Sequence, residues 1–239
     1  MSYHSVRMLG LATVALAGFV FLGVGCSRGD AAGSTAKAPT ATTSVASASN
    51  VAPGAAAQDS IAVKADRGRI LGDSGAKVWL VMASDFQCPF CKQWHDDQFA
   101  KIVQKYVKPG RVRLAYLNMP LSIHPFAVPA AEAAMCASVQ DKFWPMHDSL
   151  FATQKIWEVL RDPASFFDTL ANHNHVEMAT WRTCVSKHLT LPTIESDYDR
   201  ARRVGANSTP TFIVGATKLA SADADVAGAL DAALAAKGK

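Results

Sequence analysis

The sequence lacks the residue patterns of several protein classes. Its single Cys-x-x-Cys pair has no second close pair of cysteines and no pair of histidines at zinc-finger spacing, so the ligands of a structural zinc site are missing. The net charge is only +4, and no basic stripe with interleaved aromatic residues occurs, which excludes a nucleic-acid partner. Internal repeats are absent as well. What remains is a chain whose residues 61–239 are long enough for one sizeable core.

The first 25 residues have the pattern of an export signal. His4 and Arg7 give a basic start, and a stretch without charge follows. The segment Leu22-Gly-Val-Gly-Cys26 resembles a bacterial lipobox, in which Cys26 would be lipidated. Lipidation would also explain the odd number of cysteines, five, in an exported protein. The alternative is an uncleaved N-terminal helix. Both predict a protein of the periplasm or cell surface that is tethered to a membrane.

Residues 26–60 have the composition of a linker. They are almost entirely Ala, Ser, Thr, Gly and Pro, and cannot bury enough apolar surface to offset the entropy of ordering them. We therefore expect a flexible tether with a root-mean-square reach of about 30 Å. Residues 66–75 predict a turn-rich entry to the folded domain, which we place at residues 61–239.

The pattern of apolar residues predicts an α/β fold. Residues 78–84 form a nearly continuous apolar run, as in a strand buried on both faces, and helical spacing follows. Residues 112–117 predict a second strand parallel to the first, because strand, helix and strand of these lengths form a βαβ unit. Residues 121–205 look helical, and strand signals return at 211–214 and 217–219. We expect a sheet interrupted by a helical insertion.

The most informative motif is Cys88-Pro89-Phe90-Cys91, which ends the first apolar strand and opens the helix. Pro89 suits the first helical position, so Cys88 becomes the N-cap. The unpaired N–H groups and the positive end of the helix dipole then favour a thiolate at Cys88, the nucleophile of disulfide exchange. Cys91 lies one turn inside the helix and can close the disulfide. Half of a zinc site is the alternative, but it would need two further ligands.

Two segments carry a resemblance to a known family. Asp85-Phe-Gln-Cys-Pro-Phe-Cys-Lys92 together with Ser208-Thr-Pro-Thr-Phe-Ile213 resembles the DsbA-like branch of the thioredoxin superfamily. Residues 123–136 and 143–148 are similar to the helical insertion of that branch. The resemblance implies a thioredoxin fold with an inserted helical domain and a cis bond between Thr209 and Pro210. It also implies that the backbone of Thr209 lies beside the sulfurs, where it pairs with an extended substrate.

The chain departs from that pattern at two positions. Many members have a buried acid six residues before the first cysteine, where this chain has Met82. Asp85 and His95 are the nearby groups that we weigh as substitutes for that acid in moving a proton. Strongly oxidising members have histidine before the second cysteine, where this chain has Phe90. We therefore expect a weaker oxidant, with a reduction potential between about −120 and −270 mV.

Four further residues are candidates for defined roles. Cys136 and Cys184 are expected to form a structural disulfide in an oxidising compartment, with two buried free thiols as the alternative. His124 precedes a proline in a loop that we place in the vicinity of the active site. His147 lies in an apolar stripe, and we interpret it as a packed or capping histidine.

The resulting hypothesis is thiol–disulfide exchange on exported proteins, introducing disulfide bonds. The substrates would be reduced or unfolded exported proteins, and the resemblance implies reoxidation by a membrane thiol oxidase linked to quinone. We expect no cofactor and no metal at this site. One alternative is a membrane-tethered reductase or isomerase. The other is a non-enzymatic lipoprotein that binds a protein or copper, with Met82 or Met119 as soft ligands.

Overall fold

Residues 53–237 are the part of the chain that this computed structural model describes. The predicted export signal at residues 1–25, the lipidation site Cys26 and most of the predicted linker lie outside it. Among the helices of the described part, none combines the length and the apolar character that crossing a bilayer requires.

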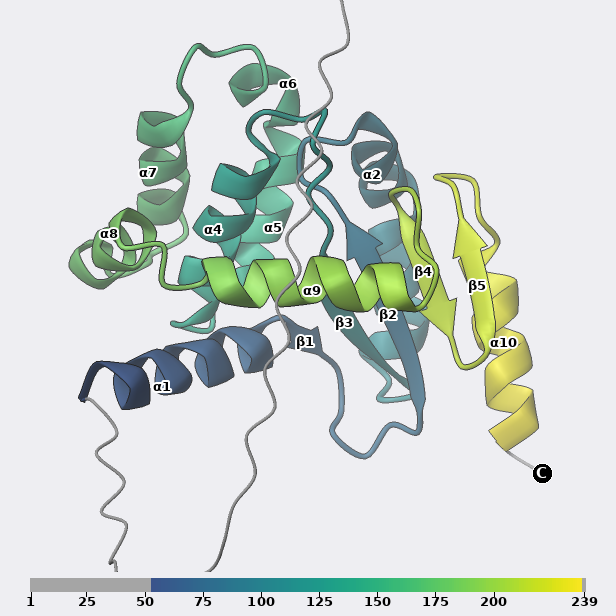
Figure 1. The fold of residues 1–239 in the computed structure, drawn as a ribbon. Helices are drawn as coiled ribbons and strands as arrows, with labels where there is room; N and C mark the ends of the chain where they lie inside the picture. The colour runs from purple at the N-terminus through teal and green to yellow at the C-terminus, as the bar shows by residue number, and fades with distance from the viewer. Residues whose placement is uncertain (1–52, 238–239) are drawn as a thin grey trace, which may run out of the picture. The chain divides into compact units, whose positions relative to one another are not determined.

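The elements alternate between strands and helices, with the helices concentrated between the third and fourth strands (Figure 1). The strands are β1 (Ile70–Leu71), β2 (Val78–Ser84), β3 (Val112–Asn118), β4 (Thr211–Val214) and β5 (Thr217–Ala220). The helices are α1 (Pro53–Gly68), α2 (Pro89–Trp94), α3 (Ala100–Ile102), α4 (Ala127–Ser138), α5 (Phe143–Ala152), α6 (Gln154–Trp157), α7 (Ala164–His173), α8 (Met178–Ser186), α9 (Leu191–Arg203) and α10 (Val226–Lys237). The predicted α/β class with a helical insertion is confirmed.

The five strands form one sheet in the order β1-β3-β2-β4-β5. β2 and β3 are parallel, as the βαβ pattern predicts, and the register places Val78 opposite Val112 and Ser84 opposite Asn118. The other three pairings are antiparallel. β2 is therefore central, with β3 on one side and β4 on the other, which brings the end of β2 next to the start of β4.

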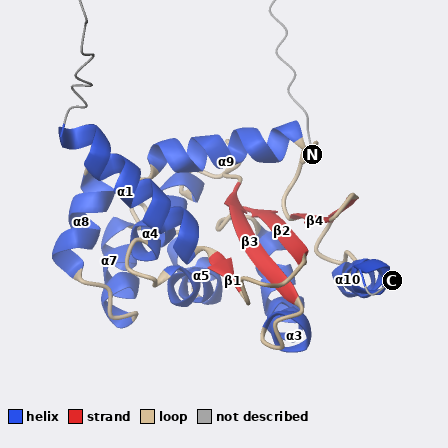
Figure 2. Cartoon of the chain, turned by 90° about the horizontal axis from the view of Figure 1, so that it is seen from below, coloured by secondary structure: helices blue, strands red, loops and turns tan. Residues whose placement is uncertain are grey.

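Helices cover both faces of this sheet. Figure 2 shows α9 along one face and α3 and α10 against the opposite face. The helices α4, α5, α7 and α8 pack on one another beside the sheet and form the insertion. The main core runs without interruption through both parts, because Tyr116 of β3 stacks on Phe86 with ring centroids 5.1 Å apart and lies 5.2 Å from Phe143 of α5. The insertion is thus packed onto the sheet through aromatic residues.

The helix after β2 is less regular than its apolar spacing predicts. From Pro89 to Val107 the backbone stays helical, but it passes through two π-helical stretches, His95–Phe99 and Val103–Val107. A π turn adds a residue to the turn and often marks a functional region. The first of these stretches begins four residues after Cys91.

The predicted entry to the domain is wrong in its first part. Helix α1 begins at Pro53, inside the predicted linker, and ends at Gly68, so it includes only the first three residues of the segment predicted to be turn-rich. One physical reason lies in the composition of residues 53–68, where the helix-favouring residues Ala, Gln, Lys and Arg outnumber Gly and Pro. Contact with α4 also supports α1, since the hydroxyl of Ser138 donates a hydrogen bond of 2.6 Å to the carbonyl of Ala65.

A buried ion pair connects the start of the sheet to α9. Arg69, 4% exposed, binds both oxygens of the fully buried Asp197, with 2.9 Å between Nη2 and Oδ1. Asp197 also accepts hydrogen bonds of 3.2 Å and 2.9 Å from the backbone and the side chain of Asn118. Arg69 donates further to the carbonyl of Tyr116 at 3.0 Å. Charges this deeply buried persist because each one is paired and hydrogen-bonded.

The insertion has a covalent bond of its own. The structure joins Cys136 of α4 to Cys184 of α8, residues that are 48 positions apart in sequence, by a disulfide. Both residues are buried, and the indole of Trp181 on α8 donates to the carbonyl of Ala133 on α4 at 3.1 Å. The bond and the hydrogen bond hold the same two helices together.

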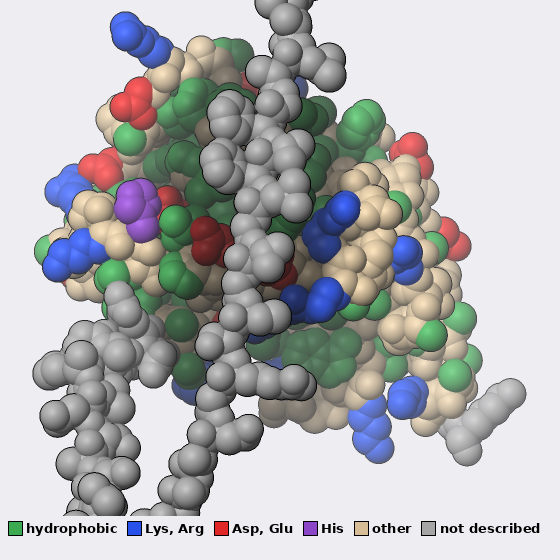
Figure 3. All heavy atoms as spheres, in the orientation of Figure 1, with side chains coloured by type: hydrophobic (Ala, Val, Ile, Leu, Met, Phe, Trp, Pro, Cys, Tyr) green, Lys and Arg blue, Asp and Glu red, His purple; other side chains and the backbone are tan. Residues whose placement is uncertain are grey.

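The charged groups on the surface are mixed in sign. In the space-filling view of Figure 3, Lys and Arg side chains occur at several separated places and Asp and Glu side chains lie between them. Several of these groups form exposed ion pairs, such as Lys155 with Glu158 at 3.0 Å and Arg182 with Asp168 at 2.9 Å. Such pairs contribute little to stability individually.

Candidate active site

The turn between β2 and α2 places Cys88 at the start of the helix. The N–H of Cys88 donates to the carbonyl of Asp85 at 3.1 Å, which closes the turn. Cys88 has extended dihedral angles, φ −71° and ψ 124°, and it is the N-cap, with Pro89 in the first turn. Its carbonyl accepts the first helical hydrogen bond from Lys92 at 3.1 Å. The geometry is the one that the Cys-Pro dipeptide predicts.

The two thiols of the motif differ strongly in acidity. The hydrogen bond from the Cys91 thiol, followed by those from Thr209 and from the N–H groups of Cys91 and Phe90, lowers the pKa of Cys88 to about 6 against the opposing effect of burial. Burial itself raises the pKa of Cys91 well above its usual value. Both cysteines are in the reduced state, and both are buried, 3% and 2% exposed. The sequence predicts Cys88 to be the more exposed residue, but this difference is small.

A loop from the far side of the insertion covers the sulfur of Cys88. The bond between Thr209 and Pro210 is cis, and the Cys88 thiol donates to the carbonyl of Thr209 at 3.5 Å. Thr211 begins β4 and lies opposite Ala83 of β2, so the central strand pairing fixes the loop beside the dithiol. Residues 121 positions apart in sequence therefore form one site.

Asp85 and His124 lie in this site and contact each other. The Nδ1 atom of His124 is 2.7 Å from Oδ2 of Asp85, and the N–H of Leu121 donates to the same oxygen at 2.9 Å. The other oxygen of Asp85 accepts the N–H of Gln87 at 2.7 Å. The backbone N–H of Asp85 faces the sulfur of Cys91 at 3.5 Å. The carboxylate thus links the active-site turn to the loop that leads into α4.

Met82, at the position where many family members have a buried acid, has apolar neighbours. His95, one of the two residues suggested as substitutes for that acid, lies away from the dithiol. Met82 is 2% exposed and lies in β2 between Tyr116 and Phe212 on the neighbouring strands. His95 hydrogen-bonds to Asp96 and Asp148 and to neither sulfur. Asp85, the other suggested substitute, lies next to the dithiol, and its backbone N–H makes the contact with the sulfur of Cys91.

The surface next to the dithiol is apolar. Phe90, between the two cysteines, is 59% exposed, and Ile123, next to His124, is 78% exposed. Met82 and Met119, considered above as copper ligands, are both buried and belong to different clusters of the core.

Gln154 is a site residue that the sequence did not reveal. Its side chain is fully buried, and its amide donates to the carbonyls of Phe86 at 2.7 Å and of Cys88 at 3.1 Å. It reaches the turn from α6, so the insertion directly holds the segment that carries Cys88. A lone glutamine ahead of an Ile-Trp pair gives no pattern that would have identified it.

Replacing Gln154 with methionine is expected to destabilise the protein by about 1–3 kcal/mol, because two buried carbonyls lose a donor. The buried amide oxygen of Gln154, Oε1, has no hydrogen-bond partner among the described residues. Its removal costs nothing, so the loss of stability should lie toward the lower end of that range. Urea unfolding with a linear extrapolation measures the change. Gln104→Met, on the exposed helix surface, is the matched control. Equal stabilities of the two variants would contradict a role for Gln154 in holding the turn.

Comparison with protein families places the chain among proteins of this fold. The family model described as Thioredoxin matches residues 64–232. The chain is 33% identical over 155 residues to the Na(+)/H(+) antiporter NhaA 3 of Salinispora tropica, a match that covers 64% of this chain and 22% of the antiporter. It thus spans less than a quarter of that relative. It is also 26% identical over 155 residues to disulfide bond formation protein D of Bacillus subtilis, covering 61% of this chain and 66% of that protein.

Solved structures of related proteins superimpose on most of this chain. The oxidised form of BdbD from Bacillus subtilis superimposes with a TM-score of 0.64 at 26% identity, covering 71% of this chain and 94% of BdbD. Alpha-DsbA1 of Wolbachia pipientis superimposes with a TM-score of 0.62, covering 70% of this chain and 91% of that one. At 18% identity, the second similarity concerns the fold alone.

Proposed function

The chain belongs to the thioredoxin family and to its DsbA-like members, and on this basis we propose that it is a protein-disulfide oxidoreductase that introduces disulfide bonds into exported proteins. The observation that carries the proposal is the contrast within the dithiol. Cys88 has a pKa of about 6, whereas burial raises that of Cys91 well above normal. One sulfur is therefore a stable thiolate near neutral pH, and the other is not.

In the proposed reaction the oxidised enzyme takes two electrons from a substrate dithiol. A substrate thiolate attacks the sulfur of Cys88, the bond between Cys88 and Cys91 breaks, and the Cys91 sulfur takes up a proton because its pKa is high. The second substrate thiolate then attacks the substrate sulfur of the mixed disulfide. Cys88 leaves as a thiolate, and the substrate keeps the new disulfide.

The acidity of Cys88 favours this direction. A thiolate stabilised in the reduced enzyme makes the disulfide a better oxidant, and a good leaving group speeds its release from the substrate. A pKa of about 6 is lower than that of thioredoxin, about 7, and higher than that of the strongest oxidant of this kind, about 3.5. We therefore place the reduction potential between about −120 and −270 mV.

The substrate is proposed to bind as an extended, unfolded segment. The backbone of Thr209 beside Cys88 offers it a strand to pair with, and the exposed Phe90 and Ile123 offer apolar contacts. Thr209 and Pro210 thus take part in positioning the substrate, and Asp85 with His124 shapes the adjacent loop. This arrangement suits reduced proteins that have not yet folded.

We propose that the protein works outside the cytoplasm. The disulfide between Cys136 and Cys184 supports this, since such bonds persist in oxidising compartments. Residues 1–25 would direct export, and a lipid on Cys26, or an uncleaved N-terminal helix, would tether the domain. A membrane thiol oxidase linked to quinone is the proposed source of oxidising equivalents for Cys88 and Cys91.

Titration of the Cys88–Cys91 pair against glutathione tests the direction. The full chain is equilibrated in buffers of known redox poise, and the reduced fraction is measured by alkylation. A potential toward the −120 mV end, together with oxidation of a reduced test protein, supports the oxidase, whereas one near about −270 mV, with reduction of insulin, supports the reductase alternative. Failure in both assays would contradict an oxidoreductase of either kind.

Alkylation of the reduced protein by iodoacetamide is expected to follow a titration with a midpoint near pH 6, because Cys88 ionises there rather than at its ordinary value of 9.0. The folded thiol ionises at lower pH than the unfolded one. The reduced form therefore gains stability as the pH rises from about 6 toward 9 and loses it as the pH falls through 6. The rate is measured by mass spectrometry between pH 4 and 10. A midpoint above pH 8 would contradict the proposed activation of Cys88.

A further inference from the structure

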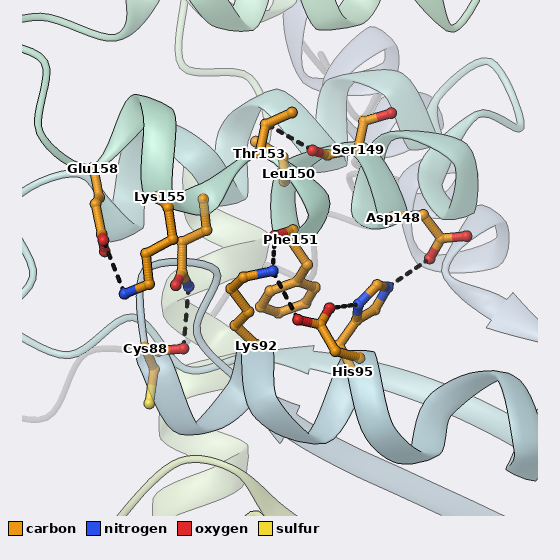
Figure 4. A network of polar contacts seen from close by, with 12 residues as sticks. Cys88, Lys92, His95, Asp148, Ser149, Leu150, Phe151, Thr153, Lys155 and Glu158 are labelled. Carbon is orange, nitrogen blue, oxygen red and sulfur yellow. Dashed lines mark hydrogen bonds and ion pairs between the residues drawn. The ribbon is translucent and has the colours of Figure 1, made fainter.

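Two histidines and an aspartate meet away from the dithiol. One ligand atom from each of His95, His147 and Asp148 lies within 4.8 Å of the other two. Oδ1 of Asp148 is 3.2 Å from Nε2 of His95 and 2.8 Å from Nδ1 of His147. His95 lies in the helix that carries Cys88, and His147 and Asp148 lie on α5. Figure 4 shows His95 pointing from its helix toward Asp148.

His95 has a fixed orientation. Its Nδ1 atom is 3.0 Å from Oδ1 of Asp96, and the other oxygen of Asp96 accepts a hydrogen bond of 2.8 Å from Lys92. Lys92 is in turn held by the carbonyl of Phe151 at 2.9 Å. Because a carboxylate only accepts hydrogen bonds, Nδ1–H of His95 donates to Asp96 and Nε2–H donates to Asp148. A carboxylate at Nδ1 also orients histidines that bind metals, and a metal ion at Nε2 would replace the proton there.

His147 has the matching orientation. The ring is buried, and its Nε2 atom has no hydrogen-bond partner among the described residues. It is packed edge-on against Phe86, Tyr116 and Phe151, with interplanar angles of 75°, 85° and 82°. Because a carboxylate only accepts, the contact of 2.8 Å places the N–H of this ring on Nδ1, where it donates to Asp148. A metal ion at Nδ1 would replace that proton.

Two imidazole nitrogens and a carboxylate oxygen thus converge on one point, where a metal ion can replace the two protons that the nitrogens donate to the carboxylate. We propose that His95, His147 and Asp148 bind one divalent transition-metal ion, represented by Zn²⁺, through Nε2, Nδ1 and Oδ1. Two imidazoles and a carboxylate are typical ligands of such ions, at about 2.0–2.2 Å. Tetrahedral binding at this length separates ligand atoms by about 3.3 Å, so the two contacts to Asp148 would open slightly, and the two histidine nitrogens, which lie within 4.8 Å of each other, would take the same separation.

The site leaves one coordination position open. His95 and Asp148 line a hollow of about 520 Å³ together with Asp96 and Phe99. The side chain of Asp148 is 55% exposed, that of His95 15% and that of His147 1%. An ion would therefore enter from the side of Asp148 and keep a water molecule or an exchangeable ligand in the fourth position, as in metal sites with three protein ligands.

Zn²⁺ binding by the full, untagged chain tests the proposal. The Cys88–Cys91 pair is first oxidised to a disulfide, so that its thiols cannot bind the ion. Isothermal titration with Zn²⁺ is expected to show one ion per chain. His95→Ala and Asp148→Ala are expected to weaken binding by more than about 100-fold, since even an outer-shell partner is worth about 10–100-fold. His173→Ala, which changes an exposed histidine at the C-terminal end of α7, is the matched control and should bind as the natural protein does.

Cobalt gives an independent readout. Co²⁺ bound to the natural chain is expected to show the visible absorption of a four- or five-coordinate ion, and both variants should lose it while keeping their thermal unfolding transition. The proposal is wrong if the oxidised natural chain binds no Zn²⁺, or if His95→Ala and Asp148→Ala bind it as tightly as His173→Ala. Neither result bears on disulfide exchange, because the measurement uses no redox reaction.

Discussion

Replacing Cys88 with serine is expected to reduce disulfide exchange to the uncatalysed rate. A serine hydroxyl cannot form a disulfide and is not ionised near neutral pH, whereas the Cys88 thiol has a pKa of about 6. The measurement is the oxidative refolding of a reduced test protein, followed by the recovery of its activity. Circular dichroism shows whether the variant is folded.

The companion variant Cys91→Ser separates the two roles. It keeps the nucleophile but removes the thiol that would release it, so with a test protein that already contains a disulfide the Cys88 thiolate attacks that bond, one substrate sulfur leaves as a thiolate, and the mixed disulfide through Cys88 is expected to accumulate. Mass spectrometry of the trapped adduct identifies the sulfur involved. Substantial exchange by Cys88→Ser, or an adduct carried by another cysteine, would refute the assignment of the nucleophile.

The double replacement Cys136→Ala with Cys184→Ala is expected to lower the free energy of unfolding by about 4 kcal/mol. The bond closes a loop with a sequence separation of 48, and the chain-entropy model gives this value for a loop of that size. Typical domains have only about 5–15 kcal/mol in total, so the loss would be large. Urea unfolding of both proteins, with Cys88 and Cys91 oxidised in each, measures it.

The control for that experiment is the natural chain in which only the Cys88–Cys91 disulfide is reduced. Reduction of Cys88–Cys91 alone should leave most of the stability of the insertion in place, because those residues do not link α4 to α8. A loss below about 1 kcal/mol in the double variant would contradict the view that the bond between Cys136 and Cys184 constrains the unfolded chain.

The parts of the fold that depend on local patterns could be predicted from the sequence. The apolar run of residues 78–84 indicated a buried strand, and Pro89 after Cys88 indicated a helix start with a cysteine cap. The family resemblance added the cis bond before Pro210 and the helical insertion. Each of these rests on residues that are neighbours in sequence or on a motif with a fixed geometry.

The parts of the fold that depend on tertiary packing could not be predicted from the sequence. Gln154 reaches the carbonyl of a cysteine 66 residues earlier, and Arg69 pairs with Asp197, 128 residues later. Neither pair has a spacing or a composition that distinguishes it from surface polar residues. The π-helical stretch His95–Phe99 is a third example, because one extra residue in a turn hardly changes the apolar periodicity.

The boundary of α1 was missed for a different reason. Alanine is common both in flexible linkers and in helices, so the composition of residues 53–60 favours neither one by itself. The decision comes from the following turns, where Ala65 is fully buried and contacts Ser138. A contact of this kind stabilises a helix that would be marginal in isolation.

The two ends of the insertion are anchored at the same edge of the sheet. At its entrance, Leu121 and His124 bind the carboxylate of Asp85, next to the sulfurs. Near its exit, Asp197 of α9 binds Asn118, the last residue of β3, which lies opposite Ser84 at the end of β2. A displacement of the cysteine turn during the catalytic cycle would therefore reach both the first and the last helix of the insertion.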